Sequence, residues 1–317
     1  IIGGIVVAIV FVLFVIFVND VAQVFSDSSV CSLYADDIKL YSDFKFENGL
    51  SNLTSDLAAL ENWAKLWQLD INIDKCQVLQ LGPSNGLANY GINDAQLSSV
   101  GCVNDLGVII DRRLKFNDHI ESIVKKGFQR LAILKRGFLS RDHKVLIKAY
   151  TTYVRPVLES ATCVWSPVYK KDIDLLERVQ KRFTKMLYGM KEFSYVERLV
   201  SYVECLVFLD LEPLELRRLK IDLVMYFKIV HGYSCLDAKE FFTFDSSALK
   251  SRHHDNLKLV KPRFRTDTFK HSFFVRCVDV WNSLSFELRS KPSLHAFKAN
   301  LDRTDLKRFL RGSCFAR

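Results

Sequence analysis

The spacing of apolar residues along the chain predicts strands first and helices afterwards. Residues 26–43 place apolar and β-branched residues on both sides of a short acidic centre, which predicts two strands joined by a tight turn. Residues 48–70 repeat apolar side chains every three or four positions, which predicts a helix. Residues 71–82 then alternate and stop at a Gly-Pro pair, as a half-buried strand does. The N-terminal part is therefore expected to combine short strands with one helix.

The pattern changes to long helical stripes after residue 116. Residues 90–114 still contain short β segments, with Asn-Asp turn signals at 93–94 and 104–105. From residue 117 onward, apolar residues form continuous stripes with basic residues beside them. One predicted helix follows residue 117 directly, and the later ones cover 142–153, 170–188, 195–232 as a pair joined near Pro213, and 271–282. We therefore expect an α+β fold.

Residues 1–18 form an uncharged apolar run that allows two interpretations. Eighteen apolar residues reach the lower limit for a membrane-spanning helix. The run lacks flanking Lys or Arg and the basic region typical of a signal peptide. A buried strand and turn followed by a buried helix gives the same pattern. A membrane anchor in residues 1–18 is therefore an alternative that the pattern leaves open.

The charge balance favours a polyanionic partner. The 317 residues include 45 Lys and Arg against 36 Asp and Glu, a formal net charge of +9. Such an excess favours nucleic acid or an anionic membrane face. The eight cysteines contain no CxxC pair, so we expect reduced thiols rather than a zinc ribbon or a redox site. Residue 1 is Ile and the Met count is only three, which leads us to expect a processed chain or a part of a longer one.

The residues most able to carry chemistry are Tyr34-Ala35-Asp36-Asp37. Two adjacent carboxylates on a hairpin turn repel each other, and a divalent cation offsets that repulsion. Carboxylate oxygens are hard ligands that suit Mg²⁺, which keeps waters and phosphate oxygens in its shell. In a two-metal site such ions activate an attacking hydroxyl and stabilise the leaving oxygen. A solvated Asp-Asp turn is the alternative interpretation.

Several ordered blocks of the sequence together resemble one known family. The first blocks are LFVIFVND (13–20), SLYADDIKLYS (32–42), LENWAKLWQLDINIDKC (60–76) and DLGVIIDRRLKFNDHI (105–120). Further blocks follow at 149–167, 173–185, 252–260, 271–284 and 293–298. In this order they resemble the reverse transcriptases of jockey-like non-LTR retrotransposons, over about residues 13–300.

The resemblance implies DNA synthesis from a primer 3′ hydroxyl, with an RNA template, a DNA primer, dNTP substrates and two Mg²⁺ ions. Asp36 and Asp37 match the catalytic, metal-binding carboxylates of the palm, and Tyr34 matches a residue near the primer end. Lys75, in the predicted strand after the palm helix, matches the lysine that neutralises or protonates the departing pyrophosphate. Gly107 matches a hairpin near the primer grip, where glycine allows close backbone approach. A surface lysine and an ordinary hairpin glycine are the alternatives at the last two positions.

The resemblance also implies a domain arrangement. Residues 1–115 are expected to form a partial reverse transcriptase palm with the acidic hairpin. A helical thumb-like region is expected at 116–190, and a helical C-terminal region at 191–317. The family implies a location inside the cell, in the cytoplasm and the nucleus.

One carboxylate that the family uses has no match in the sequence. These polymerases take a further aspartate from an earlier palm strand, whereas only Asp20 and Asp27 precede Asp36 and neither fits that motif. Two metal ions cannot be held in place without it. We therefore expect the chain to be inactive alone, as a C-terminal part or a relic of such an enzyme. A basic nucleic-acid-binding protein without catalysis is the alternative.

Two further groups of residues are candidates for binding sites. Basic side chains on two predicted helices suit phosphate contacts, although a solvated helix face gives the same pattern. They are Lys125, Lys126, Arg178, Lys181, Arg182 and Lys185. A zinc site is conceivable at His231, Cys235, His253 and His254, but their spacing is long and irregular. An aromatic cluster with Phe241, Phe242 and Phe244 is the alternative there.

Overall fold

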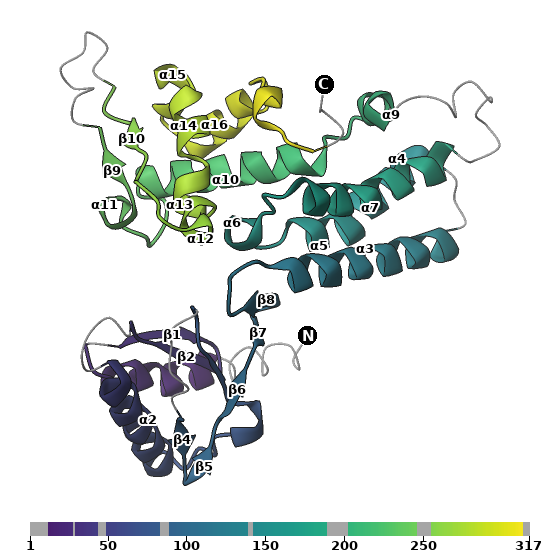
Figure 1. Cartoon of the computed structure of the whole chain (residues 1–317). Coiled ribbons are helices and arrows are strands. Elements are labelled where there is room, and N and C mark those ends of the chain that lie inside the picture. Colours follow the sequence, from purple (N-terminus) through teal and green to yellow (C-terminus); the bar gives the residue numbers. More distant parts are fainter. Residues whose placement is uncertain are drawn as a thin grey trace. The chain divides into compact units, whose positions relative to one another are not determined.

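The computed structural model contains two compact units (Figure 1). The residues that it describes are 12–27, 29–43, 49–82, 89–138, 142–188, 202–245 and 255–312. The first unit comprises Ile1–Val103 with Asp111–Arg113, and the second comprises Asn104–Ile110 with Leu114–Arg317. The fold is mixed α/β, mostly helical, with small two-stranded sheets. The expected combination of strands and helices is therefore confirmed at this level.

Short strands and one long helix make up the first part of the chain. Residues 12–18 are helical and continue into the 3-10 helix η1 (Asn19–Val24). The elements that follow are β1 (Val30–Tyr34), β2 (Asp37–Tyr41), α2 (Gly49–Leu66), the 3-10 helix η2 (Ile73–Lys75), β3 (Gln77–Leu79), β4 (Gly91–Ile92), β5 (Ala95–Gln96), β6 (Ser98–Val100), β7 (Cys102–Asp105) and β8 (Val108–Asp111). Strands β1 and β2 pair in antiparallel fashion, as do β4 and β5, whereas β3 and β6 pair in parallel.

The β1–β2 hairpin packs on one face only, and burial alternates along both of its strands. Leu33 and Ile38 are partners in the strand register, and both are half-buried. They pack against a core of five residues from η1, α2 and the helix before η1. This core consists of Val18, Val21, Leu60, Trp63 and Ala64. The other face of the hairpin is left for solvent, because side chains alternate between the two faces of a strand.

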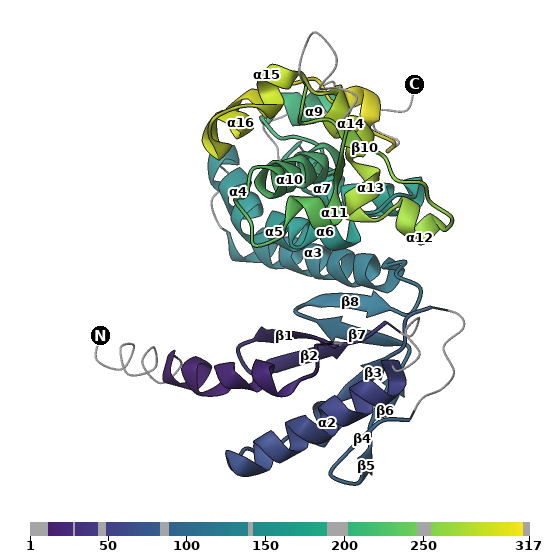
Figure 2. The same ribbon diagram turned by 90° about the vertical axis from the view of Figure 1, so that its left-hand side faces the viewer.

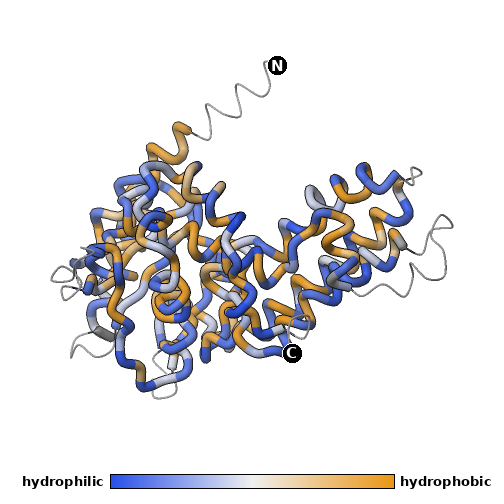
Figure 3. The backbone as a smooth tube through the Cα atoms, turned by 90° about the horizontal axis from the view of Figure 1, so that it is seen from above, coloured by the Kyte–Doolittle hydropathy of each residue, from blue (hydrophilic) through white to orange (hydrophobic). Residues whose placement is uncertain are grey.

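The apolar N-terminal run is only partly described. The hydrophobic residues 12–18 form the helical stretch near the N-terminal end of the tube in Figure 3. Val18 is buried, whereas Leu13 and Ile16 are 59% and 66% exposed. None of the helices that the structure describes has both the length and the apolar content needed to cross a bilayer. Residues 1–11 lie outside the described residues, so the anchor hypothesis is tested only in part.

Helices dominate the second unit. They are α3 (Asn117–Gly137), α4 (His143–Ala149), the π-helical turn η3 (Tyr150–Val154), α5 (Arg155–Glu159), α6 (Thr162–Trp165), α7 (Lys170–Tyr188), α9 (Tyr202–Phe208) and α10 (Leu214–Val230). The smaller elements after them are α11 (Ala238–Phe241), β9 (Thr243–Phe244), β10 (Leu259–Val260), α12 (Asp267–Lys270), α13 (Phe273–Arg276), α14 (Val278–Ser283), α15 (Phe286–Arg289), α16 (Leu294–Leu301) and the 3-10 helix η5 (Lys307–Phe309). Strands β9 and β10 pair in antiparallel fashion.

Two hydrophobic clusters fill this unit, and α10 contributes to both. The first cluster extends from Val108 to Leu214 and includes the buried faces of α3 and α7. The second extends from Leu223 to Leu306 and is centred on large aromatic residues such as Trp281 and Phe297. Leu214 at the start of α10 belongs to the first cluster, whereas its later residues belong to the second. The two helical regions that the sequence separates at residue 190 therefore share one compact unit.

A buried ion pair ties three helices of the second unit together. Arg276 on α13 donates hydrogen bonds to both carboxylate oxygens of Asp222 on α10, at 2.9–3.1 Å. It also donates to the backbone carbonyls of Thr162 and Cys163 on α6, at 3.2 and 3.0 Å. Asp222 is only 2% exposed. Burial raises the pKa of the Asp222 carboxyl, and the facing guanidinium of Arg276 opposes that shift.

Candidate active site and nucleic-acid-binding residues

The acidic pair lies at the tip of the β1–β2 hairpin. Tyr34 and Asp37 are the last paired positions, so Ala35 and Asp36 form a two-residue loop. Ala35 has a φ of +53°, a conformation that non-glycine residues seldom adopt. Asp36 and Asp37 are both exposed. The predicted strand, turn and strand are confirmed, and adjacent carboxylates project at the turn.

Tyr34 and Asp37 lie on the outward face of the hairpin. They are directly opposite each other in the register, and Tyr34 is 66% exposed. The inward-facing pair Leu33 and Ile38 anchors the same turn to the core below it. The hairpin therefore carries the phenol ring of Tyr34 and the carboxylates of Asp36 and Asp37, while only its other face packs against the core.

The carboxylates at the tip fit a hard divalent cation but do not complete a site for it. Mg²⁺ prefers oxygen ligands and usually keeps waters and phosphate oxygens beside one or two carboxylates. Asp36 and Asp37 supply such oxygens. Within the described ranges, no group of three or more His, Cys, Asp or Glu side chains is arranged to hold a metal ion. The remaining ligands would have to come from water, from a nucleotide or from another carboxylate.

The two earlier aspartates are placed differently from each other. Asp20 accepts a hydrogen bond of 3.2 Å from the indole Nε1 of Trp63, a core residue of the first unit. Asp27 is exposed, and the neighbouring Ser26 is instead held by Asp56 through bonds of 2.8 and 3.1 Å. Asp20 thus has a structural partner within the fold.

The structure corrects the predicted surroundings of Lys75. This residue ends the 3-10 helix η2 and precedes β3, whereas the sequence places it in a strand. The Asn72 carbonyl accepts the Lys75 N–H at 3.1 Å, which closes the turn. The Lys75 side chain is exposed. Its role toward pyrophosphate stays a prediction.

The backbone conformation at residue 107 explains why this position is a glycine. Leu106 and Gly107 form the loop between β7 and β8, with φ values of +46° and +87°. Only glycine adopts such a φ without a steric penalty. A Cβ atom added at Gly107 would meet nothing within 4 Å, so no close approach within the protein requires a glycine. The predicted turn at 104–105 is therefore wrong by two residues, since Asn104 and Asp105 belong to β7.

His119 supports this hairpin, a role that the sequence does not indicate. It lies near the start of α3, and its Nδ1 atom accepts the backbone N–H of Ile109 in β8 at 3.2 Å. The ring also packs edge-on against Trp165, with 5.0 Å between the ring centroids. Burial, and secondarily the charge of Lys126, lowers the pKa of His119 to about 4. The imidazole is therefore neutral and fixed as an acceptor.

The low pKa of His119 makes the stability of the second unit depend on pH. Between pH 6.5 and about 4 the unfolded chain binds a proton at this position that the folded chain does not bind. Stability should therefore fall as pH decreases through that window, by at most about 3 kcal/mol. Urea unfolding measured across the window checks this expectation. His119→Gln keeps an acceptor without titrating and should remove that part of the pH dependence; an unchanged profile in this variant would contradict the assignment.

The basic residues on α3 and α7 fall into two groups. Lys125 and Lys126 on α3 are exposed, as are Arg178, Arg182 and Lys185 on α7. The last three follow helical spacing and share one face of α7. Lys181 differs, because it is half-buried with its Nζ atom 5.1 Å from the centre of the Tyr202 ring. Lys181 therefore has an aromatic partner within the fold, and its role toward phosphates stays a prediction.

The zinc candidates are not brought together among the residues that can be compared. The His231 ring bonds to the carbonyl of Arg289 at 2.8 Å and packs against Phe227. Cys235 is exposed, and His253 and His254 lie outside the described residues. Phe241 and Phe242 instead pack with Phe274, with centroid distances of 4.4 and 5.6 Å. The aromatic cluster is thus present as a packing feature of the second unit.

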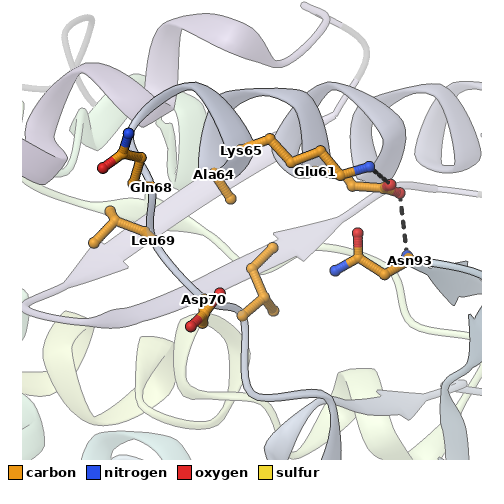
Figure 4. Close-up of a pocket in the computed structure, with 8 residues that line it drawn as sticks. Glu61, Ala64, Lys65, Gln68, Leu69, Asp70 and Asn93 are labelled. Atoms are coloured by element: carbon orange, nitrogen blue, oxygen red, sulfur yellow. Dashed lines mark hydrogen bonds and ion pairs between the residues drawn. The ribbon is translucent and has the colours of Figure 1, made fainter.

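A shallow pocket in the first unit contains none of the predicted site residues (Figure 4). It lies between the end of α2 and the β4–β5 turn, and Glu61 joins its two sides. The Glu61 carboxylate accepts the Asn93 N–H at 3.1 Å and pairs with Lys65, which lowers the pKa of Glu61. Asn93 and Asp94 have φ values of +51° and +59°, which confirms the predicted turn at 93–94. The pocket marks how the turn is fixed to α2.

Comparison with known proteins identifies the N-terminal part of the chain. Residues 8–110 match the family model described as Reverse transcriptase (RNA-dependent DNA polymerase). The matched region contains the hairpin, Lys75 and Gly107, and it ends before α3 and α7. The N-terminal part of the chain is therefore similar to the reverse transcriptase family over these residues.

The similarity extends to particular mobile elements. The chain is 26% identical over 166 residues to a probable RNA-directed DNA polymerase from transposon BS of Drosophila melanogaster, covering 49% of this chain and 18% of that protein. It is 28% identical over 178 residues to the RNA-directed DNA polymerase from mobile element jockey of Drosophila funebris. That alignment covers 54% of this chain and 19% of the jockey protein. An uncharacterized Caenorhabditis elegans protein is 32% identical over 102 residues. That alignment covers 31% of this chain and 52% of the nematode protein.

The resemblance to reverse transcriptases of jockey-like non-LTR retrotransposons is thereby confirmed. The alignments span about half of the nematode relative and under a fifth of the two fly polymerases. No solved structure shows significant similarity to the chain.

Proposed function

We propose that the chain supplies part of the palm of an RNA-directed DNA polymerase, with Asp36 and Asp37 as its metal ligands. One observation carries the proposal: adjacent, exposed carboxylates lie at the tip of a two-residue hairpin within a segment that matches the reverse transcriptase family. The substrates on this account are an RNA template, a DNA primer and a dNTP, and the reaction is attack of the primer 3′ hydroxyl on the nucleotide.

The residues of the chain would share this reaction as follows. Asp36 and Asp37 would hold the cations through their carboxylate oxygens. Mg²⁺ bound there would lower the pKa of the primer hydroxyl and neutralise charge on the leaving pyrophosphate. Tyr34 faces the same side of the hairpin as Asp37 and would line the site near the primer end. Lys75 would neutralise or protonate the departing pyrophosphate.

The packing beneath the hairpin turn favours Asp36 and Asp37 as metal ligands, because it holds their backbone in place. A metal site needs ligands whose backbone is held to a fraction of an ångström. Leu33 and Ile38 secure the turn to η1 and α2, and Trp63 in turn bonds to Asp20. The carboxylates can therefore be exposed without the turn being loose, since Leu33 and Ile38 pack directly beneath it.

We also propose that the 317-residue polypeptide does not extend a primer unless another segment supplies a third carboxylate. Asp36 and Asp37 are two of the three ligands that the family uses, and Asp20 is engaged with Trp63. The experiment that tests the function is primer extension on an RNA template. It compares the polypeptide alone with the product of the complete transcribed reading frame, each with and without the substitution Asp36→Ala.

A second function, binding of duplex nucleic acid by the helical unit, is favoured by the exposed basic face of α7. Arg178, Arg182 and Lys185 share that face, and Lys125 and Lys126 add positive charge on α3. Each phosphate contact releases a condensed counterion, which makes affinity depend on salt. This second proposal does not depend on catalysis at the hairpin.

Binding of an RNA–DNA duplex should weaken steeply with salt, with a log–log slope of about −3 to −4 for about four neutralised phosphates. The triple variant Arg178→Gln, Arg182→Gln and Lys185→Gln should lower that slope by about 2.7. Fluorescence anisotropy with a labelled duplex measures both. A control with equal charge loss changes the exposed residues Lys298, Arg303 and Lys307 to Gln. Equal slopes for the two triple variants would contradict the role of α7.

A further inference from the structure

A strongly basic segment lies in the second unit, outside residues 8–110, which match the reverse transcriptase family model. We call Lys258–Lys270 the basic segment; it includes β10, α12 and the residues between them (Figures 1 and 2). Every residue from 261 to 270 is exposed. Its cationic side chains are Lys258, Lys261, Arg263, Arg265 and Lys270, and its one acidic residue is Asp267. A net charge of this density in so short a stretch attracts a polyanion.

The two arginines at the centre of the segment have no ion-pair partner among the described residues. Lys261 pairs with Asp279 of α14, so its charge is partly compensated. Across the part of the chain that the structure describes, neither Arg263 nor Arg265 forms a salt bridge. A planar guanidinium donates two parallel hydrogen bonds to a phosphate and also stacks on flat rings. These two side chains are therefore available to a ligand.

Exposed aromatic rings alternate with these cations. Phe264 lies between Arg263 and Arg265 and is 41% exposed, and Phe269 is 44% exposed. The ammonium group of Lys270 lies 5.7 Å from the centre of the Phe264 ring. A ring held in this way presents a flat apolar surface beside positive charge. Unpaired bases stack on such surfaces irrespective of sequence.

The segment is exposed although both of its ends are fixed. At its start, Asn282 bonds to both backbone groups of Leu259, at 3.0 and 2.8 Å, and Trp281 donates to the carbonyl of Leu257 at 2.9 Å. At its end, the Thr266 hydroxyl caps α12 by accepting the N–H of Phe269. Pro262 restricts the backbone between these anchors. A segment fixed at both ends loses less entropy when it binds a ligand.

We propose that the basic segment binds single-stranded nucleic acid, with bases stacked on Phe264 and phosphates held by Arg263 and Arg265. A duplex is disfavoured because its bases are already stacked and offer no free face to the ring. A membrane surface is disfavoured because the segment has no amphipathic helix that could insert among lipids, since α12 has only four residues. The proposal goes beyond polymerisation at the hairpin and does not depend on it.

The test measures fluorescence anisotropy of the full chain with labelled oligo(dT) and oligo(rU). Oligomers of about 20 nucleotides exceed the 4–16 nucleotides that such sites cover. The substitution Phe264→Ala should weaken binding of both by about tenfold, the loss expected for one stacked base. The double variant Arg263→Gln and Arg265→Gln should lower the salt slope by about 1.4, the value for two phosphates of a single strand.

Matched controls separate this site from general attraction to a basic protein. Phe286→Ala removes another exposed phenylalanine of the same unit, also 41% exposed. Lys298→Gln with Arg303→Gln removes the same charge elsewhere. Both should bind the oligomers as the unaltered chain does. Equal losses in the controls, an equal loss of duplex affinity in Phe264→Ala, or binding only to vesicles of anionic lipid would overturn the proposal.

Discussion

Replacing Arg276 by methionine should destabilise the second unit by about 3–5 kcal/mol, because the substitution leaves the Asp222 carboxylate buried without its partner. Asp222 is 2% exposed and receives three hydrogen-bond contacts from the guanidinium. The same side chain also satisfies the carbonyls of Thr162 and Cys163. For a unit of this size the loss corresponds to a decrease in Tm of about 10 °C.

Two comparisons show whether burial causes the effect. Lys261→Met breaks the exposed pair with Asp279 and should change stability by less than about 1 kcal/mol. The double variant Asp222→Leu with Arg276→Met removes both charges, so it should be more stable than the single variant Arg276→Met. Urea unfolding measures all three. If Arg276→Met costs no more than Lys261→Met, the buried pair does not hold the three helices together.

Local patterns were sufficient to predict the hairpin that carries the candidate site. Apolar and β-branched residues on both sides of Asp36 and Asp37 predicted the two strands. The register, which puts Leu33 and Ile38 on the inner face, is known from the structure. The Asn93-Asp94 turn was also predictable, since these residues tolerate a positive φ. The hydrophobic pattern changes from strand-like to helical near residue 115. The structure divides the chain into its two units over residues 103–114.

Features that depend on distant contacts could not be predicted from the same patterns. The turn at Leu106 places an apolar residue in a left-handed conformation, and its sequence gives no signal for that. The helix predicted to end before Pro156 continues through the π-helical turn η3 into α5, which accommodates the missing N–H of the proline. The bond between His119 and Ile109 joins a helix to a strand, so no spacing indicates it.

The role of each candidate site residue still rests on resemblance rather than on geometry. The structure places Tyr34 beside Asp37 and corrects the surroundings of Lys75. It also shows the Lys181 ammonium group beside the Tyr202 ring. These placements depend on side-chain packing, which the sequence pattern predicts less well than it predicts the strands themselves.

Replacing Asp36 by alanine should lower primer extension by about 1,000-fold or more. The reason is that a metal ligand contributes several kcal/mol of transition-state stabilisation, and each 1.36 kcal/mol changes a rate tenfold. The fold should be unaffected, because Asp36 is exposed at a loop. Asp27→Ala is the matched control, an exposed aspartate of the same unit that precedes the hairpin. It should retain the activity of the unaltered enzyme.

The 317-residue polypeptide tested alone should show no extension with any of these variants. Activity of the polypeptide alone that still required Asp36 would disprove the need for a third carboxylate, but it would support the hairpin as the site. The two parts of the proposed function can therefore fail separately.

The measurement that tests the hairpin most directly is extension of an oligo(dT) primer on poly(rA) with Mg²⁺. The 5′ end of the transcript is mapped first, and the enzyme is the product of the complete reading frame that contains residues 1–317. The account predicts extension by the unaltered enzyme and by Asp27→Ala, and loss of extension in Asp36→Ala. Extension by Asp36→Ala at a rate within tenfold of the unaltered enzyme would contradict it.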